Sequence, residues 1–240
     1  EQYSRYSILS IGIHEGSDAI HAQIKNRNPD IKIVGYVASQ EIHKYSLSRN
    51  PVDMLYQTVE NNNWWRWTHE SDSESCNSVE KCSCPRYSPM PSGCWDYARE
   101  KCHFQNWPCT WSVDLTDDCP LGQAEWTDYR WNDGMPKFLS ENLFNRQCGN
   151  GKDSWDGVFL DNFFYRDPAW NEGSNKILQS IKEFNPERIK MINGQMKLDG
   201  CYQTDTDCPG VCPYRELADY LLQEHFLGGN FKKGPNQWYG

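Results

Sequence analysis

Short apolar runs alternate with polar turns in the first part of the chain. Residues 6–13 (YSILSIGI) and 31–38 (IKIVGYVA) are rich in Ile and Val, which favours buried strands. Between them Ser17 or Asp18 can cap a helix whose apolar positions end before Asn28 and Pro29. A strand, a helix and a second strand in this order predict a parallel βαβ unit.

The pattern breaks at residues 61–120, where neither a strand nor a helix period survives. Tryptophans, prolines and seven cysteines (Cys76, Cys82, Cys84, Cys94, Cys102, Cys109 and Cys119) crowd this segment. We interpret it as an insertion that disulfides hold together because it lacks a core of its own.

Strands and helices alternate again from residue 112 onwards. The pattern predicts strands at 112–116, 157–162, 188–193 and 219–225, and helices in the second half of 126–144 and at 175–184. With 7–13 and 31–38 these make six candidate strands, fewer than the eight of a complete barrel. The expected fold is therefore α/β, a TIM-type (β/α) barrel that is complete or truncated. Its first units lie in 1–60, the insertion in 61–120 and the remaining units in 112–240.

The cysteine content points to an oxidising compartment. The chain has 11 cysteines among its 240 residues, with irregular spacings that favour disulfides over a zinc site. We therefore expect a secreted or extracellular protein without a metal, and an odd cysteine that is free or bonded to another chain. No signal peptide opens the sequence, so we expect a processed or truncated form.

Charge and hydropathy exclude several classes of partner. The formal charge is -9 without a basic stripe, which excludes nucleic acid and favours a neutral or cationic ligand. No apolar run is long enough to cross a bilayer. Phosphate loops and dinucleotide fingerprints are absent from the sequence, so no cofactor is expected.

Polar side chains follow most of the predicted strands. In a parallel α/β fold such residues converge on one face, where binding and catalytic sites form. Among them Asp161 and Glu224 are the best candidates for a catalytic pair, because glycosidic cleavage needs two carboxyl groups across a cleft. The alternative is that each acid caps a helix or forms an ion pair. The full set is Glu15, Glu41, Asp114, Asp161, Asn162, Asn193 and Glu224.

Aromatic residues suit a sugar ligand, because an exposed indole face can stack on the apolar face of a pyranose ring. The chain has 11 Trp and 13 Tyr. The alternative is that most of these rings fill the interior of the insertion. The candidates for stacking are Trp64, Trp65, Trp67, Trp126 and Trp131, and the last two are expected to contact substrate.

Residues 155–162 (WDGVFLDN) resemble a strand motif of glycoside-hydrolase-like (β/α) barrels, namely the hypothetical glycosyl hydrolase and endo-polygalactosaminidase-like families. Residues 31–36 (IKIVGY), 186–194 (PERIKMING) and 221–226 (LLQEHF) are similar to other strands of that group. The resemblance implies a catalytic Asp161 with Glu224 as its partner. It also implies that Glu41 and Asn193 line a sugar site, to which the pattern of polar residues after strands adds Asp114 and Asn162.

Two functional hypotheses follow. The first is a secreted glycoside-hydrolase-like domain that binds or cleaves a polysaccharide. The second is a non-catalytic, barrel-derived subunit of an extracellular assembly whose partners are other protein chains. The insertion and the low strand count motivate the second hypothesis, since neither belongs to the family pattern and a fold does not fix a function.

Overall fold

A parallel β-sheet forms the centre of the molecule in a computed structural model. The structure describes residues 6–43, 51–66, 110–149, 151–163, 168–193 and 217–222. Five strands pair in the order β1-β2-β5-β6-β7, and every pair is parallel. The strands are β1 (Ile8–Gly12), β2 (Lys32–Ala38), β5 (Gly157–Asp161), β6 (Ile189–Asn193) and β7 (Tyr220–Leu222). The parallel α/β class is confirmed, whereas a closed barrel stays a prediction.

The predicted βαβ unit is confirmed at the N-terminal side of the sheet. Helix α1 (Asp18–Arg27) connects β1 to β2, and the Ser17 side chain accepts a hydrogen bond from the Ile20 backbone N–H at 3.3 Å. This contact satisfies one of the free N–H groups at the start of the helix. The helix ends at Arg27 with Asn28 as its C-cap, directly before Pro29, as the sequence predicts.

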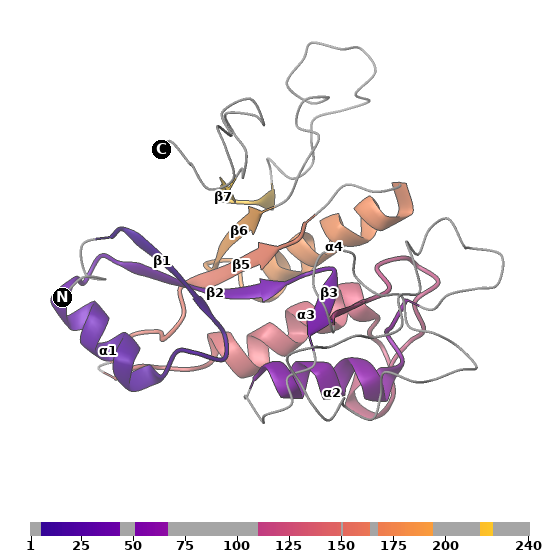
Figure 1. Cartoon of the computed structure of the whole chain (residues 1–240), viewed down its shortest axis with the longest axis horizontal. Helices are drawn as coiled ribbons and strands as arrows, with labels where there is room; N and C mark the ends of the chain where they lie inside the picture. The colour runs from indigo at the N-terminus through magenta and orange to yellow at the C-terminus, as the bar shows by residue number, and fades with distance from the viewer. Residues whose placement is uncertain are drawn as a thin grey trace, which may run out of the picture.

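Two further helices follow the pattern of the C-terminal half. Helix α3 (Trp131–Leu139) continues into a π-helical turn (Ser140–Phe144), and α4 (Pro168–Phe184) begins before the predicted range. In Figure 1, α1, α2 and α3 lie below the sheet, and α4 lies to the right beside α3.

The strand predicted at 112–116 differs from the prediction in both bounds and partner. Strand β4 (Thr110–Ser112) pairs antiparallel with β3 (Glu41–His43) in a separate two-stranded sheet. Val113 then forms only an isolated bridge with Trp65. Among the described residues this strand therefore does not extend the parallel series. Helix α2 (Val52–Asn62), which the sequence analysis did not predict, lies next to β3.

The two faces of the parallel sheet differ in burial. Ile33, Val37, Val158, Leu160 and Ile192 are at most 6% exposed and belong to the core that includes side chains of α1, α3 and α4. We call this the helix-covered face. The alternate residues of the same strands form the second face, which we call the half-exposed face. On it Tyr36, Asp161, Met191, Tyr220 and Leu222 are partly or well exposed, whereas Val34, Phe159 and Asn193 are buried. Parallel sheets are usually covered on both sides, so exposure here singles this face out.

Aspartates at the amino ends of two strands fix the register of their neighbours. The Asp156 backbone N–H donates to Ile33 O at 2.7 Å, and its Oδ2 accepts from the Ile33 N–H at 2.8 Å. In the same way, the Asp219 backbone N–H donates to Lys190 O at 2.8 Å, and Asp219 Oδ2 accepts from the Lys190 N–H at 2.7 Å. Each aspartate also forms an ion pair with a buried lysine. Asp156 pairs with Lys25 at 2.7 Å, and Asp219 pairs with Lys190 at 2.9 Å.

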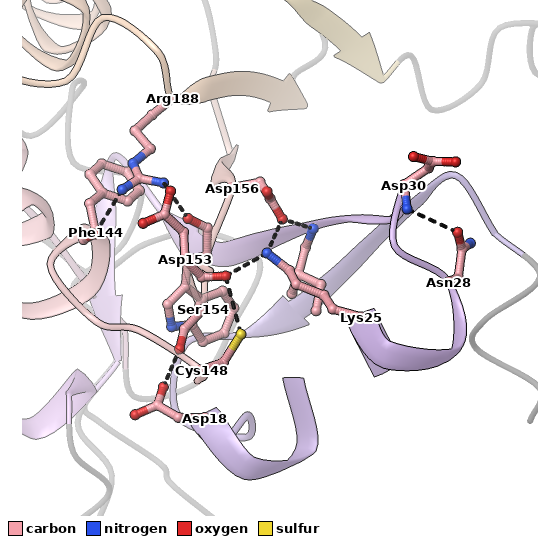
Figure 2. Close-up of polar contacts among 12 residues, drawn as sticks. Asp18, Lys25, Asn28, Asp30, Phe144, Cys148, Asp153, Ser154, Asp156 and Arg188 are labelled. Carbon is pink, nitrogen blue, oxygen red and sulfur yellow. Dashed lines mark hydrogen bonds and ion pairs between the residues drawn. The ribbon is translucent and has the colours of Figure 1, made fainter. Parts of the chain in front are cut away.

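The first of these networks extends to the start of β6 (Figure 2). Arg188 pairs with Asp153 at 2.5 Å and donates to the carbonyl oxygens of Trp155 and Phe144, each at 2.9 Å. The Arg188 hydrogen bond holds the pKa of Asp153 below its usual value. This edge of the sheet is stabilised by ion pairs between elements that are distant in sequence.

Candidate functional site

Asp161 lies at the carboxyl end of β5, on the half-exposed face. Its register neighbour on β2 is Ala38, and the adjacent strand β6 ends at Asn193. The Asn193 amide donates to Asp161 Oδ1 at 2.8 Å. The Tyr36 hydroxyl donates to Asp161 Oδ2. Donors from the two flanking strands therefore hold both carboxylate oxygens.

The backbone around Asp161 is also held in place. Its carbonyl oxygen accepts from the Ser39 backbone N–H at 3.0 Å and from the Ser39 hydroxyl at 3.1 Å. The next residue, Asn162, has a left-handed φ of 55°. Asparagine adopts this conformation more readily than most residues, and such turns are common at functional sites. The Phe163 N–H then donates to Asn193 O at 2.8 Å. The end of β5 is therefore a fixed platform for one carboxylate.

Glu41 is the second carboxylate that the structure brings to this edge. It begins β3 and is 3% exposed, and Asn162, at 7%, donates its side-chain amide to Glu41 Oε1. Glu41 therefore contacts the turn that follows Asp161. Its burial suits support of that turn better than direct contact with a large ligand.

Asp114 has a local role in this structure. Its Oδ1 accepts from the Thr116 N–H at 2.9 Å and from the Thr116 hydroxyl at 2.7 Å. This is the side-chain turn that aspartate commonly forms two residues before its donor. Within the described part of the chain, the Asp114 carboxylate makes no hydrogen bond to Asp161 or to the side chains that hold it.

The tryptophans expected to contact sugar are buried. Trp131 is fully buried and donates its indole N–H to Ser39 O at 3.1 Å, while Trp126 is 7% exposed. Trp64 and Trp65 are buried in the same core. The expectation of exposed indole faces is wrong for these four residues, because they pack against one another and against α2 and α3. Trp67 lies outside the described residues.

The other half of the proposed catalytic pair, Glu224, lies outside the described residues. So do nine of the cysteines. The two described ones, Cys119 and Cys148, are buried free thiols, and burial raises the pKa of Cys119 to about 12. The predicted disulfides therefore stay a prediction.

Sequence reasoning missed Tyr36. It lies within β2 rather than after it, so a search of positions that follow strands does not reach it. The alternation of β2 places Tyr36 and Ala38 on one face, and Ala38 neighbours Asp161. Only the register between β2 and β5 brings Tyr36 close to Asp161, and the sequence alone does not give that register.

A hollow of about 510 Å³ lies at the opposite edge of the sheet. It is lined by Lys32, Asp153, Asp156, Phe184, Asn185, Pro186, Glu187, Arg188 and Ile189. Asp153, Asp156 and Arg188 are occupied by the ion pairs of Figure 2. We therefore assign this edge a structural role.

Neither a cluster of metal ligands nor a membrane-spanning helix occurs in the described ranges. Among these residues no three His, Cys, Asp or Glu side chains are grouped as a metal site would require. Within the same ranges, no helix combines the length and apolar character needed to cross a bilayer.

Comparison with known proteins assigns no family to the chain. No protein-family model matches it, and no curated protein matches it. A solved structure of the glycoside hydrolase domain of PelA from Pseudomonas aeruginosa is similar, with 12% identity, 92% of this chain and 60% of that chain covered, and a TM-score of 0.46. For a variant of that domain the identity is 11%, the coverage is 79% and 53%, and the TM-score is 0.42. The chain thus spans less than two thirds of the length of either structure.

Proposed function

We propose that this chain is a glycoside-hydrolase-like domain that acts on a polysaccharide at the carboxyl edge of its parallel sheet, with Asp161 as a catalytic carboxylate. The observation that carries the proposal is the position of Asp161. It ends a central strand, on the half-exposed face, with both oxygens oriented by neighbouring side chains. Sites of parallel α/β folds are commonly built at this edge.

The hydrogen bonds at Asp161 indicate which of the two carboxyl roles it performs. Tyr36 and Asn193 both donate to it, so the arrangement suits an ionised carboxylate that accepts hydrogen bonds. An ionised carboxylate attacks the anomeric carbon or activates a water molecule, whereas the second carboxyl group protonates the leaving oxygen. The family resemblance gives the second role to Glu224.

The remaining details of the proposal come from the sequence. We infer a secreted protein from the cysteine content and a barrel from the strand motifs. The separation of the two carboxyl groups would determine the stereochemical course. A distance of about 5–5.5 Å between the carboxyl groups is typical of enzymes that retain the anomeric configuration, and a distance of about 6.5–9.5 Å is typical of enzymes that invert it.

The test is the release of reducing ends from a panel of neutral, N-acetylated and amino-sugar polysaccharides. Asp161→Asn preserves the shape of the side chain and removes its charge, so cleavage should fall by at least about 100-fold. The melting temperature should stay within about 2 °C, because the side chain is only partly buried. Asp118→Asn, a change of an exposed aspartate elsewhere, is the matched control and should cleave like the wild type.

Two results would contradict this function. Full activity of Asp161→Asn would remove Asp161 from the chemistry. A wild-type protein that cleaves no member of the panel would exclude hydrolysis of these polysaccharides and favour the non-catalytic subunit of an extracellular assembly.

A further inference from the structure

We propose that Tyr36 is a further residue of the site, which orients the Asp161 carboxylate through its hydroxyl and offers its ring to the substrate. This inference rests on the proposed function. It assigns two separable tasks to one side chain, so each task can be removed while the other remains.

The position of Tyr36 follows from the strand register. Tyr36 on β2 is the register partner of Phe159 on β5. Two residues further along, Ala38 and Asp161 form the next pair on the same face of the sheet. A tyrosine side chain is long enough to reach one pair further along the strand, and the hydroxyl does so when it donates to Asp161 Oδ2. A phenylalanine at this position would fill the same space without reaching the carboxylate as a donor.

The second oxygen of Asp161 shows what this contact achieves. Asn193 holds Oδ1 from β6 at 2.8 Å, while Tyr36 holds Oδ2 from β2. The carboxylate is therefore fixed from both sides, and rotation about its terminal bond would break both contacts. Loss of the hydroxyl would leave only the Asn193 contact, so the attacking oxygen would be less well oriented.

The ring of Tyr36 is accessible, unlike the tryptophans near the same edge. It is 38% exposed, whereas the neighbouring Phe159 is 6% exposed and supports it edge-to-face, with centroids 5.6 Å apart at 68°. Aromatic rings that expose a face beside a carboxylate are suited to stack on a pyranose.

The strand on the other side of Tyr36 brings two polar side chains to the same face. The register partner of Tyr36 on that strand is Gly12. A Cβ at Gly12 would lie 2.9 Å from the His14 imidazole and 3.4 Å from the Glu15 carboxylate. His14 and Glu15 therefore lie over the end of β1, on the side of Gly12 to which a side chain would point. A ligand on Tyr36 would approach these two polar groups as well.

The experiment measures kcat and KM of three variants on the polysaccharide that the wild type cleaves best. Tyr36→Phe keeps the ring, so we expect KM to stay within about 3-fold while kcat falls by about 10-fold or more. Tyr36→Leu removes ring and hydroxyl, so kcat should fall similarly and KM should also rise. Tyr220→Phe removes the hydroxyl of another exposed tyrosine, at the far strand of the same face, and should resemble the wild type.

Asp161→Asn is measured in parallel, which separates this inference from the proposed function. If Asp161→Asn is inactive while Tyr36→Phe has the kcat of the wild type, the orienting role of Tyr36 is overturned and the function stands. If Asp161→Asn is active, both fall. A Tyr36→Leu protein with an unchanged KM would overturn the contact between ring and substrate. Because Tyr36→Leu also lacks the hydroxyl, it tests the orienting role if Tyr36→Phe fails to fold.

Discussion

At the scale of single residues, burial decides how several polar side chains behave. His21 on α1 is fully buried, with its ring edge-to-face against Trp155 at a centroid distance of 4.5 Å. Gly16 leaves room for it, because a Cβ there would lie 2.3 Å from His21 Nε2. Burial lowers the pKa of His21 to about 4, and the nearby Asp18 only partly opposes this effect.

The lowered pKa of His21 predicts a loss of stability in mild acid. An unfolded histidine has a pKa of about 6.5, so the unfolded state binds more protons than the folded state between pH 6.5 and 4. Stability should therefore fall as the pH decreases through this window, by on the order of 2 kcal/mol from this residue. Urea unfolding of the wild type and His21→Phe at pH 7 and pH 4.5 measures it. The variant should lose less stability than the wild type, and an identical loss in both proteins would contradict the assignment.

The sequence predicted some residues of the candidate site and not others. Asp161 and Asn193 were predicted to converge because both end strands, and the structure joins them at 2.8 Å. The exposure of Trp126 and Trp131 was predicted wrongly, since composition does not reveal which rings pack together. Their burial depends on tertiary contacts, such as the bond from Trp131 to Ser39 O.

At the scale of elements, the ion pair between Lys25 and Asp156 ties α1 to the start of β5. The Lys25 side chain is 5% exposed, and its ammonium also donates to the Asp153 carbonyl oxygen at 2.5 Å (Figure 2). Asp156 in turn accepts from the Ile33 N–H, which fixes the pairing of β2 with β5. One carboxylate therefore connects a helix and two strands.

Removal of this carboxylate should be costly. Asp156→Ala leaves the Lys25 ammonium buried without its counter-charge, which typically costs about 3–5 kcal/mol. Asp30→Ala, at an exposed aspartate in the turn before β2, should change stability by less than about 0.5 kcal/mol. The free energy of unfolding from urea titration compares the two. A loss below about 1 kcal/mol for Asp156→Ala would show that the pair does not stabilise the fold.

Elements with a strong pattern were easier to predict than those without one. The apolar runs that became β2, β5 and β6 were predicted to within one residue at both ends of each strand. Helix α2 was missed although Val52, Leu55, Tyr56 and Val59 are all buried at helical spacing. The three-residue strand β3 offers too few positions for any alternation, so only its antiparallel pairing with β4 defines it.

At the scale of the whole molecule, the two faces of the sheet differ in burial, and its two edges differ in their polar contacts. The helix-covered face belongs to one continuous core with α1, α3 and α4, which includes most of the buried apolar residues that the structure describes. The half-exposed face contains Tyr36, Asp161 and Asn193 at one edge, and the ion pairs of Lys25 and Arg188 lie at the other. The proposed function uses the carboxyl edge for ligand chemistry, whereas the ion pairs stabilise the amino edge.

The central claim is that a sugar binds against Asp161 on the half-exposed face. A crystal structure of the Asp161→Asn protein with the oligosaccharide that the wild type releases tests it most directly. We expect a sugar ring over Tyr36, with a hydroxyl or the anomeric carbon within about 3–3.5 Å of the substituted side chain. An oligosaccharide bound elsewhere, or a half-exposed face covered by other parts of the chain, would contradict the account.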